Sequence, residues 1–240
     1  MVAGLPLADE LSVVFARMSG LLLSEETVST AVGLVTSLAQ DCIPGTVGAG
    51  VTLIDEGGGK STSAASDPVV ERADSVQYEL DEGPCLTAWA QRTLVRIDDI
   101  ESDGRWPRWC RAVQPLGLRA AMSTPLVAGD RPLGAIKVYA RQPGAFDTHA
   151  ERRLVMFGAQ AAILLANVQS FENARRLSDG LKEALRGRDL IATAKGVLMA
   201  RDGTTEEPAF TMLVALAQQE HKTLREAAHA LVRSTVRRGH

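Results

Sequence analysis

The sequence predicts an α+β protein of two modules: an antiparallel sheet with flanking helices, then a long connecting helix and a C-terminal bundle of three helices. Short apolar runs separated by turn residues fill the stretch from residue 46 to residue 139, with helical patterns between them. From residue 148 onward the pattern is helical throughout. The charge divides as well, because residues 1–179 carry 16 Lys and Arg against 22 Asp and Glu, whereas residues 180–240 carry 10 against 7. We therefore expect an acidic N-terminal module and a basic C-terminal one.

The N-terminal module is expected to begin with a helix over 25–41. Ser24 stands in its N-cap position, and Val28 and Val32 begin an apolar stripe at helical spacing. The remaining elements are expected, in chain order, as a strand at 46–54, a turn at 55–59, strands at 60–65 and 75–80, a helix at 85–91, a strand at 94–97, a helix at 105–116, and a hairpin of strands 120–127 and 132–139.

Residues 148–186 predict one long helix. Its apolar side chains are separated alternately by three and four residues, the spacing of a coiled-coil seam: Leu154, Phe157, Ala161, Leu164, Val168 and Phe171. The seam is either a face packed on the module's own core or the contact of a parallel dimer. Beyond residue 168 no sheet remains for the helix to cover, so there the pattern favours a homodimeric coiled coil.

Residues 187–240 predict three helical blocks. The first covers 189–200, the second follows Thr205 as its N-cap, and the third begins at Lys222 or Thr223. Phe210 recurs with the apolar residues of the second block at helical spacing. We expect Phe210 in the core of the bundle, with stacking on a nucleic-acid base as the alternative.

Several classes of function are disfavoured by the residue types that are missing. All four histidines lie at residue 149 or later, so the preceding residues offer no imidazole for acid–base catalysis or metal binding. The three cysteines have no CxxC spacing, and no phosphate-loop or hydrolase motif is present. Neither a signal peptide nor a run of about 18 apolar residues is found. We therefore expect a cytoplasmic protein that is not an enzyme, holds no metal or cofactor and does not enter a membrane.

Three motifs follow one another in the C-terminal segment: RDLIATAKGVLM at 188–199, AFTML at 209–213 and LREAA at 224–228. In this order and spacing they resemble the ANTAR family of bacterial RNA-binding transcription antiterminators. Val214 departs from that family, which commonly has arginine there. The resemblance implies a dimer that binds a pair of short RNA hairpins in a nascent transcript and so prevents a terminator hairpin from forming.

The N-terminal module is similar to the GAF domain family on the motif LDEGPCL at 80–86 and on the strands STPL at 123–126 and LGAI at 133–136. The resemblance implies an α+β fold that senses a small molecule or dimerises. The residues that GAF domains use for cyclic nucleotides are not apparent, so the ligand is open. We expect the boundaries to be an N-terminal extension at 1–20, a GAF-like sensor domain at 21–170, a coiled-coil linker helix at 171–186 and an ANTAR domain at 187–240.

RNA contacts need cations that neutralise phosphates. The candidates in the C-terminal segment are Arg188, Lys195, Arg201, Lys222 and Arg225. In the sensor module, the candidates to line a ligand pocket are Cys85, Trp89, Trp106, Trp109 and Met122, although such residues are also common in cores. Together these features predict a signal-responsive, RNA-binding regulator of transcription antitermination. The alternative is a ligand-sensing scaffold whose C-terminal bundle mediates protein–protein interaction.

Overall fold

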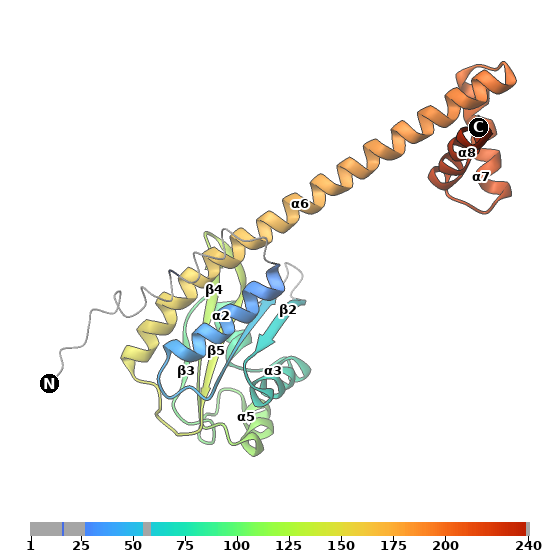
Figure 1. The fold of residues 1–240 in the computed structure, drawn as a ribbon. Coiled ribbons are helices and arrows are strands. Elements are labelled where there is room, and N and C mark those ends of the chain that lie inside the picture. The colour runs from blue at the N-terminus through green and yellow to red at the C-terminus, as the bar shows by residue number, and fades with distance from the viewer. Residues whose placement is uncertain (1–15, 17–26, 55–58, 239–240) are drawn as a thin grey trace. The chain divides into compact units, whose positions relative to one another are not determined.

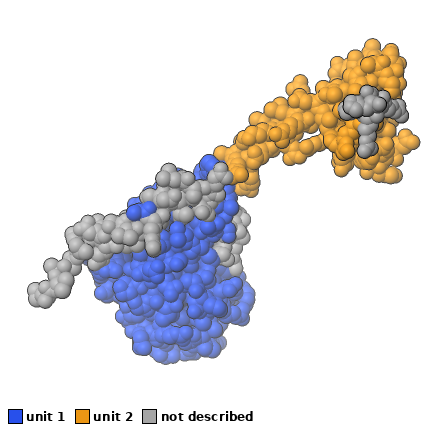
Figure 2. Space-filling model, viewed as in Figure 1, with its two compact units in different colours: residues 1–172 blue, residues 173–240 orange. Residues whose placement is uncertain are grey.

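The computed structural model describes residues 16, 27–54 and 59–238. They belong to two compact units, residues 1–172 and residues 173–240 (Figures 1 and 2). The expected cap Ser24, most of the extension at 1–20 and most of the turn at 55–59 lie outside the described residues. The fold class is the expected one: an antiparallel sheet with flanking helices, a long helix and a helical bundle.

The first unit is built on a five-stranded antiparallel sheet in the order β2-β1-β5-β4-β3. Strands β4 and β5 form the expected hairpin, with Ala120 opposite Ala140 and Ala128 opposite Arg131. Successive residues of a strand point to opposite faces, so the two faces of this sheet carry different side chains. The strands are β1 (Gly48–Ile54), β2 (Lys60–Ala65), β3 (Val95–Ile97), β4 (Ala120–Ala128) and β5 (Arg131–Ala140).

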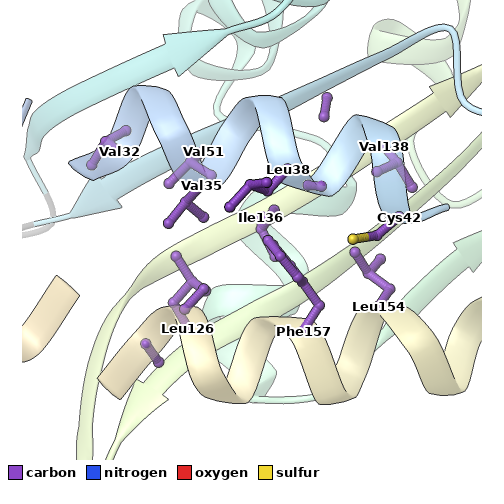
Figure 3. Close-up of a cluster of buried hydrophobic side chains, with 14 of the residues drawn as sticks. Val32, Val35, Leu38, Cys42, Val51, Leu126, Ile136, Val138, Leu154 and Phe157 are labelled. Carbon is purple, nitrogen blue, oxygen red and sulfur yellow. The ribbon is translucent and has the colours of Figure 1, made fainter. Parts of the chain in front are cut away.

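One face of the sheet is covered by helix α2 (Val28–Cys42) and by the first part of helix α6 (Thr148–Asp202). Figure 3 shows part of the apolar core that these two helices form together with the strands they cover. Thr27 caps α2 by accepting a hydrogen bond from the backbone N–H of Thr30, so the helix begins three residues later than expected. Glu172 of α6 accepts a hydrogen bond from the backbone N–H of Val28 at 2.8 Å, which ties the two helices together at that end.

The opposite face is covered by α3 (Pro68–Leu80), α4 (Pro84–Gln91) and α5 (Pro107–Val113), the last followed by a 3-10 turn, Gln114–Leu116. Trp109 of α5 is fully buried there, and its indole N–H donates to the carbonyl oxygen of Ala73 at 3.1 Å. Because that bond satisfies the indole, Trp109 can act as the centre of a second apolar core.

Residues 75–80 are helical, so the strand predicted there is wrong. Asp67 caps α3 by accepting a hydrogen bond from the backbone N–H of Val69 at 2.7 Å, and Pro68 occupies the first turn, where no donor is needed. The alternation that suggested a strand is the end of a longer helical stripe, whose buried members include Val70, Ala73, Val76 and Gln77.

The second unit is a bundle formed by the last part of α6, by α7 (Glu206–Gln219) and by α8 (Leu224–Arg238). The block predicted at 189–200 is not a separate helix, because α6 continues to Asp202 without interruption. The core is made of small and aliphatic side chains: Ala194, Leu198, Ala209, Leu213, Ala217, Ala227, Ala228 and Leu231.

Phe210 is not in this core, contrary to expectation, since 43% of its surface is exposed. On α7 the buried positions are Ala209, Leu213 and Ala217, which follow one another at intervals of four. Phe210 is rotated by about 100° from Ala209 around the helix and falls on the edge of that stripe.

The apolar side chains of the predicted coiled-coil seam of α6 are buried up to Val168 and exposed beyond it. Up to that residue its apolar side chains are buried in the core of the first unit, as the core-packing interpretation requires. Phe171 is 56% exposed. Further along, three leucines are also exposed, at 76%, 61% and 51% of their surface: Leu177, Leu181 and Leu185.

Among the described residues, α6 is the one helix that is long and apolar enough to cross a membrane by length and composition. Its most apolar window is 44% buried inside the protein. The apolar side chains of α6 that lie on the sheet, such as Leu154, Phe157 and Leu165, are fully buried, so packing within the first unit accounts for them.

Candidate nucleic-acid interface

Three of the five candidate cations lie around one concave surface of the second unit. Arg188 and Lys195 are seven residues apart on α6, which is two turns, so they share a face of that helix. Arg225 reaches the same surface from α8. We call this surface the first groove; it has a volume of about 590 Å³ and is lined by Glu183, Ala184, Gly187, Arg188, Ile191, Ala192, Lys195, Glu206 and Arg225.

Lys195 bridges two helices of the bundle. Its ammonium donates to the carboxylate of Glu206 in the first turn of α7. The ammonium lowers the pKa of Glu206 through that hydrogen bond, so this carboxylate is charged at neutral pH. The Lys195 side chain is 19% exposed and that of Glu206 is 71% exposed, which leaves the pair open to solvent and to an incoming anion.

Arg225 of α8 packs against α6 and pairs with Glu183 of that helix. Gly187 of α6 is buried, and a Cβ added there would lie 3.8 Å from Cδ of Arg225, so the arginine stem packs over a backbone without a side chain. The guanidinium then reaches Glu183, one turn earlier on α6, and donates to its carboxylate. The structure thus fixes the guanidinium at the rim of the first groove.

A second groove, of about 660 Å³, shares Glu183 and Arg225 with the first. It brings in Lys222, which pairs with Glu220 at 2.7 Å, and also Arg186 and His229, which sequence reasoning missed. The signal that could have found Arg186 is its positive charge close to Arg188 in the same basic helical segment.

The fifth candidate stands apart. Arg201 pairs with its neighbour Asp202 at 2.8 Å near the end of α6 and lines neither groove. Arg188 is exposed and makes no ion pair within the part of the chain that the structure describes. Gly196 has open space where a Cβ would be, so nothing in the described chain approaches its backbone.

In the first unit the candidate pocket residues divide between the two faces of the sheet. Met122 is fully buried in the core under α2 and α6, whereas Trp106 and Trp109 belong to the core under α3 and α5. Cys85 is fully buried in the first turn of α4. Trp89 of the same helix is half-buried, and its indole nitrogen has no hydrogen-bond partner among the described residues. The structure therefore places Met122 in a different core from Trp106 and Trp109.

Sequence reasoning also missed a buried ion pair in this unit. Lys137 of β5 is fully buried, pairs with Asp74 of α3 and donates to the hydroxyl of Thr52 at 2.6 Å. Gly50 on the neighbouring strand makes room for it, because a Cβ there would lie 2.5 Å from Cε of Lys137. Burial lowers the pKa of Lys137, but the adjacent Asp74 carboxylate more than offsets this and keeps the ammonium charged. The sequence signal that could have indicated this buried pair is a single lysine, Lys137, inside an otherwise apolar strand. The structure places it opposite Gly50.

The cysteines are held as protonated thiols. Burial, followed by the charge of Asp41, raises the pKa of Cys42 to about 11; burial, followed by Asp103, raises that of Cys110 to about 11. Burial also raises the pKa of Cys85. Since the thiolate is the reactive form, these sites are unsuited to redox sensing. Within the described residues no group of three or more His, Cys, Asp or Glu side chains is placed to hold a metal ion.

Comparison with known proteins identifies both units. The GAF domain family matches residues 25–166, and the ANTAR domain family matches residues 179–232, a range that contains both grooves. A comparison with curated proteins found no match.

Among solved structures, the chain is similar to the GAF domain of a phosphoenolpyruvate-protein phosphotransferase from Acinetobacter. The identity is 17%, with 70% of this chain and 97% of that one covered and a TM-score of 0.50. A domain assigned to a two-component sensor histidine kinase of Sinorhizobium meliloti 1021 shares 16% identity over 63% and 98% of the two chains, with a TM-score of 0.51. GAF domains are signal-sensing domains and ANTAR domains are RNA-binding regulatory domains. The chain therefore belongs to the GAF family and carries an ANTAR domain after its GAF domain.

Proposed function

We propose that this protein is a signal-responsive regulator that binds RNA hairpins through its ANTAR domain and acts in the cytoplasm by transcription antitermination. The observation that carries the proposal is the first groove, where Arg188, Lys195 and Arg225 from two helices surround one concave surface. The loop of an RNA hairpin presents phosphates on a splayed single strand, which such a set of cations can neutralise. Holding two hairpins of a nascent transcript would keep an overlapping terminator hairpin from forming.

The form that binds two hairpins is, in this proposal, a homodimer joined by a coiled coil of α6. The support is the exposed row Leu177, Leu181 and Leu185, whose intervals of four place them on one side of the helix. Two copies of the chain would bury these leucines against each other and supply one ANTAR bundle for each hairpin.

The sensor part of the proposal concerns residues 21–170, which receive a small-molecule signal and pass it on through the linker at 171–186. Cys85 and the tryptophans Trp89, Trp106 and Trp109 all belong to α4 and α5 or the residue that precedes α5, which makes that side of the sheet the candidate ligand side. The proposal leaves the identity of this small molecule open, and the proposed RNA binding does not depend on it.

The test measures how tightly the full chain binds a two-hairpin leader RNA. Fluorescence anisotropy gives the affinity at several salt concentrations. Replacing Arg188 and Lys195 together by alanine removes two phosphate contacts. We expect affinity to fall by about 10-fold or more, and the slope of log affinity against log salt to decrease by roughly 1.4 to 1.8. The matched control is an exposed arginine of the first unit, Arg152→Ala, which should change neither quantity.

Unchanged affinity and slope in the double variant would remove the first groove from the RNA contact. If the native chain binds no hairpin RNA, either as a monomer or as a dimer, the bundle is better explained as a protein-interaction element of a ligand-sensing scaffold.

A further inference from the structure

Phe210 is the one aromatic residue that follows Phe171 in the sequence, and the structure leaves it on the surface of the ANTAR bundle. The core of the bundle is complete without it, since Ala209 and Leu213 fill the positions of α7 that face α6 and α8. A single exposed phenylalanine is ordinary on a protein surface. What surrounds this one is informative.

Phe210 lies next to the first groove. Glu206 and Phe210 are four residues apart on α7, so they are on the same face of that helix, one turn from each other. The carboxylate of Glu206 is the group that the ammonium of Lys195 contacts. An exposed aromatic ring therefore lies one helical turn from the point where a groove-lining cation reaches α7.

A flat apolar ring beside a cation is the combination that binds an unpaired nucleotide, because the ring stacks on the base while the cation holds a phosphate. We infer that Phe210 is a stacking site for an unpaired base of the hairpin loop, with Lys195 exchanging Glu206 for a phosphate of the same loop. This inference rests on the proposed RNA binding and adds a base contact to it. A stacked ring accepts any base but needs it unpaired, so Phe210 would distinguish the loop from the stem.

The surroundings of Phe210 favour a nucleotide over a protein partner. Of the four residues one turn away on α7, Glu206 and Glu207 are exposed and charged, whereas Leu213 is buried and Val214 half-buried. The centre of a protein interface is depleted of such charge. The other exposed large hydrophobic residue of α7, Met212, is two residues further along. It is rotated by about 200° around the helix, so the two side chains do not form one apolar patch.

The experiment uses the full chain and hairpin RNAs in which 2-aminopurine replaces each loop base in turn, because stacking on an aromatic ring quenches its fluorescence. We expect the native chain to quench the probe at one loop position. Phe210→Leu keeps an apolar side chain and loses the ring, so the quenching should vanish and affinity should fall by about 5-fold or more. Phe210→Tyr keeps the ring and should retain both. Met212→Leu is the matched control and should behave like the native chain.

Three results would overturn the inference. If Phe210→Leu binds and quenches as the native chain does, RNA binding stands and the stacking site is wrong. If Phe210→Leu lowers affinity only by weakening the dimer, seen by sedimentation, while the quenching persists, the ring contacts protein instead of RNA. If the native chain binds no hairpin at all, the proposed function fails, and the stacking site fails with it.

Discussion

Four of the five candidate cations of the ANTAR unit are already paired with carboxylates, Arg188 being the exception, so at those four RNA binding is an exchange of partners. Lys195 is paired with Glu206, and Lys222 with Glu220. Exposed ion pairs of this kind contribute about 0–1 kcal/mol to stability, so a phosphate can replace the carboxylate at little cost. The carboxylates nevertheless oppose the approach of RNA, and removing one should be visible in the affinity.

Glu206→Gln should tighten RNA binding by about 2- to 5-fold, because it removes a negative charge from the rim of the first groove and frees Lys195. Fluorescence anisotropy with hairpin RNA measures the change. Glu207→Gln is the control, since it makes the same change of charge on the next residue, whose carboxylate is not paired with Lys195. Equal effects from the two variants would mean that only total charge matters.

For the buried pair Lys137–Asp74 we predict the opposite behaviour, because losing a partner inside the core costs much more free energy than losing one at the surface. Breaking a buried ion pair leaves a charge without compensation, so Lys137→Ala should lower the free energy of unfolding by about 3–5 kcal/mol. The double variant Lys137→Met with Asp74→Leu removes both charges and should recover most of that loss. Urea denaturation measures both.

The exposed pair of Lys182 with Asp179 supplies the control, and Lys182→Ala should change the free energy of unfolding by less than about 0.5 kcal/mol. Similar losses in all three variants would contradict this account.

The buried thiols allow a chemical check on the sensor unit. The pKa values of Cys42 and Cys110 are raised to about 11, and that of Cys85 is also raised, so at pH 8 all three remain protonated. Alkylation by iodoacetamide at pH 8, followed by mass spectrometry, should be slow in the folded chain and fast in urea. Rapid labelling of Cys85 in the folded chain would show that α4 opens, and would return this cysteine to consideration as a sensor.

At the scale of elements, turn and cap residues in the sequence were enough to predict some helices and strands, whereas other predictions were wrong. The β4–β5 hairpin was predicted from its turn residues, and α7 from its cap at Thr205. The strand predicted at 75–80 failed because alternation over six residues is compatible with a helix when a cap such as Asp67 precedes it. The separate helix predicted at 189–200 is wrong because α6 continues to Asp202 as one helix, whose last part supplies Ala194 and Leu198 to the core of the bundle.

The candidate site was only partly predictable for a related reason. The spacing on one helix placed Arg188 and Lys195 together, but no sequence pattern shows that Arg225 on another helix reaches the same groove. Arg225 is a candidate from the sequence only because it is a cation of the C-terminal segment. Phe210 was assigned to the core because its spacing fits an apolar stripe, and periodicity alone cannot tell the middle of a stripe from its edge.

Two helical glycines of α6 provide a test of element stability. A Cβ at Gly180 or at Gly196 meets nothing within 4 Å, so Gly→Ala at either position should raise helix stability by up to about 1 kcal/mol. Thermal unfolding measures this. Gly196 lies next to Lys195, and if the RNA backbone approaches there, Gly196→Ala should also weaken RNA binding while Gly180→Ala leaves it unchanged. Equal RNA affinity in the two variants would exclude a close approach at Gly196.

At the scale of the whole molecule, one continuous helix belongs to both units. Its first part is fixed in the core of the sensor unit by residues such as Leu154 and Phe157, and its last part supplies Ala194 and Leu198 to the core of the ANTAR unit. Between these two parts most side chains are exposed, including Leu177, Leu181 and Leu185. A signal that changes how the sensor holds α6 can reach the RNA-binding unit through this segment, which is continuous with both cores.

Leu181→Asp tests whether that segment is the dimer contact. A charge in the middle of a leucine seam should prevent a coiled coil, whereas the fold of each unit should persist because Leu181 belongs to neither core. Sedimentation should show a monomer, and the preference for two-hairpin over one-hairpin RNA should be lost while one-hairpin affinity is retained. The control is Lys182→Ala, a neighbouring exposed residue outside the leucine row. A Leu181→Asp chain that still dimerises would move the dimer contact elsewhere. If the Leu181→Asp chain is a monomer and still prefers two-hairpin RNA, a single bundle binds both hairpins.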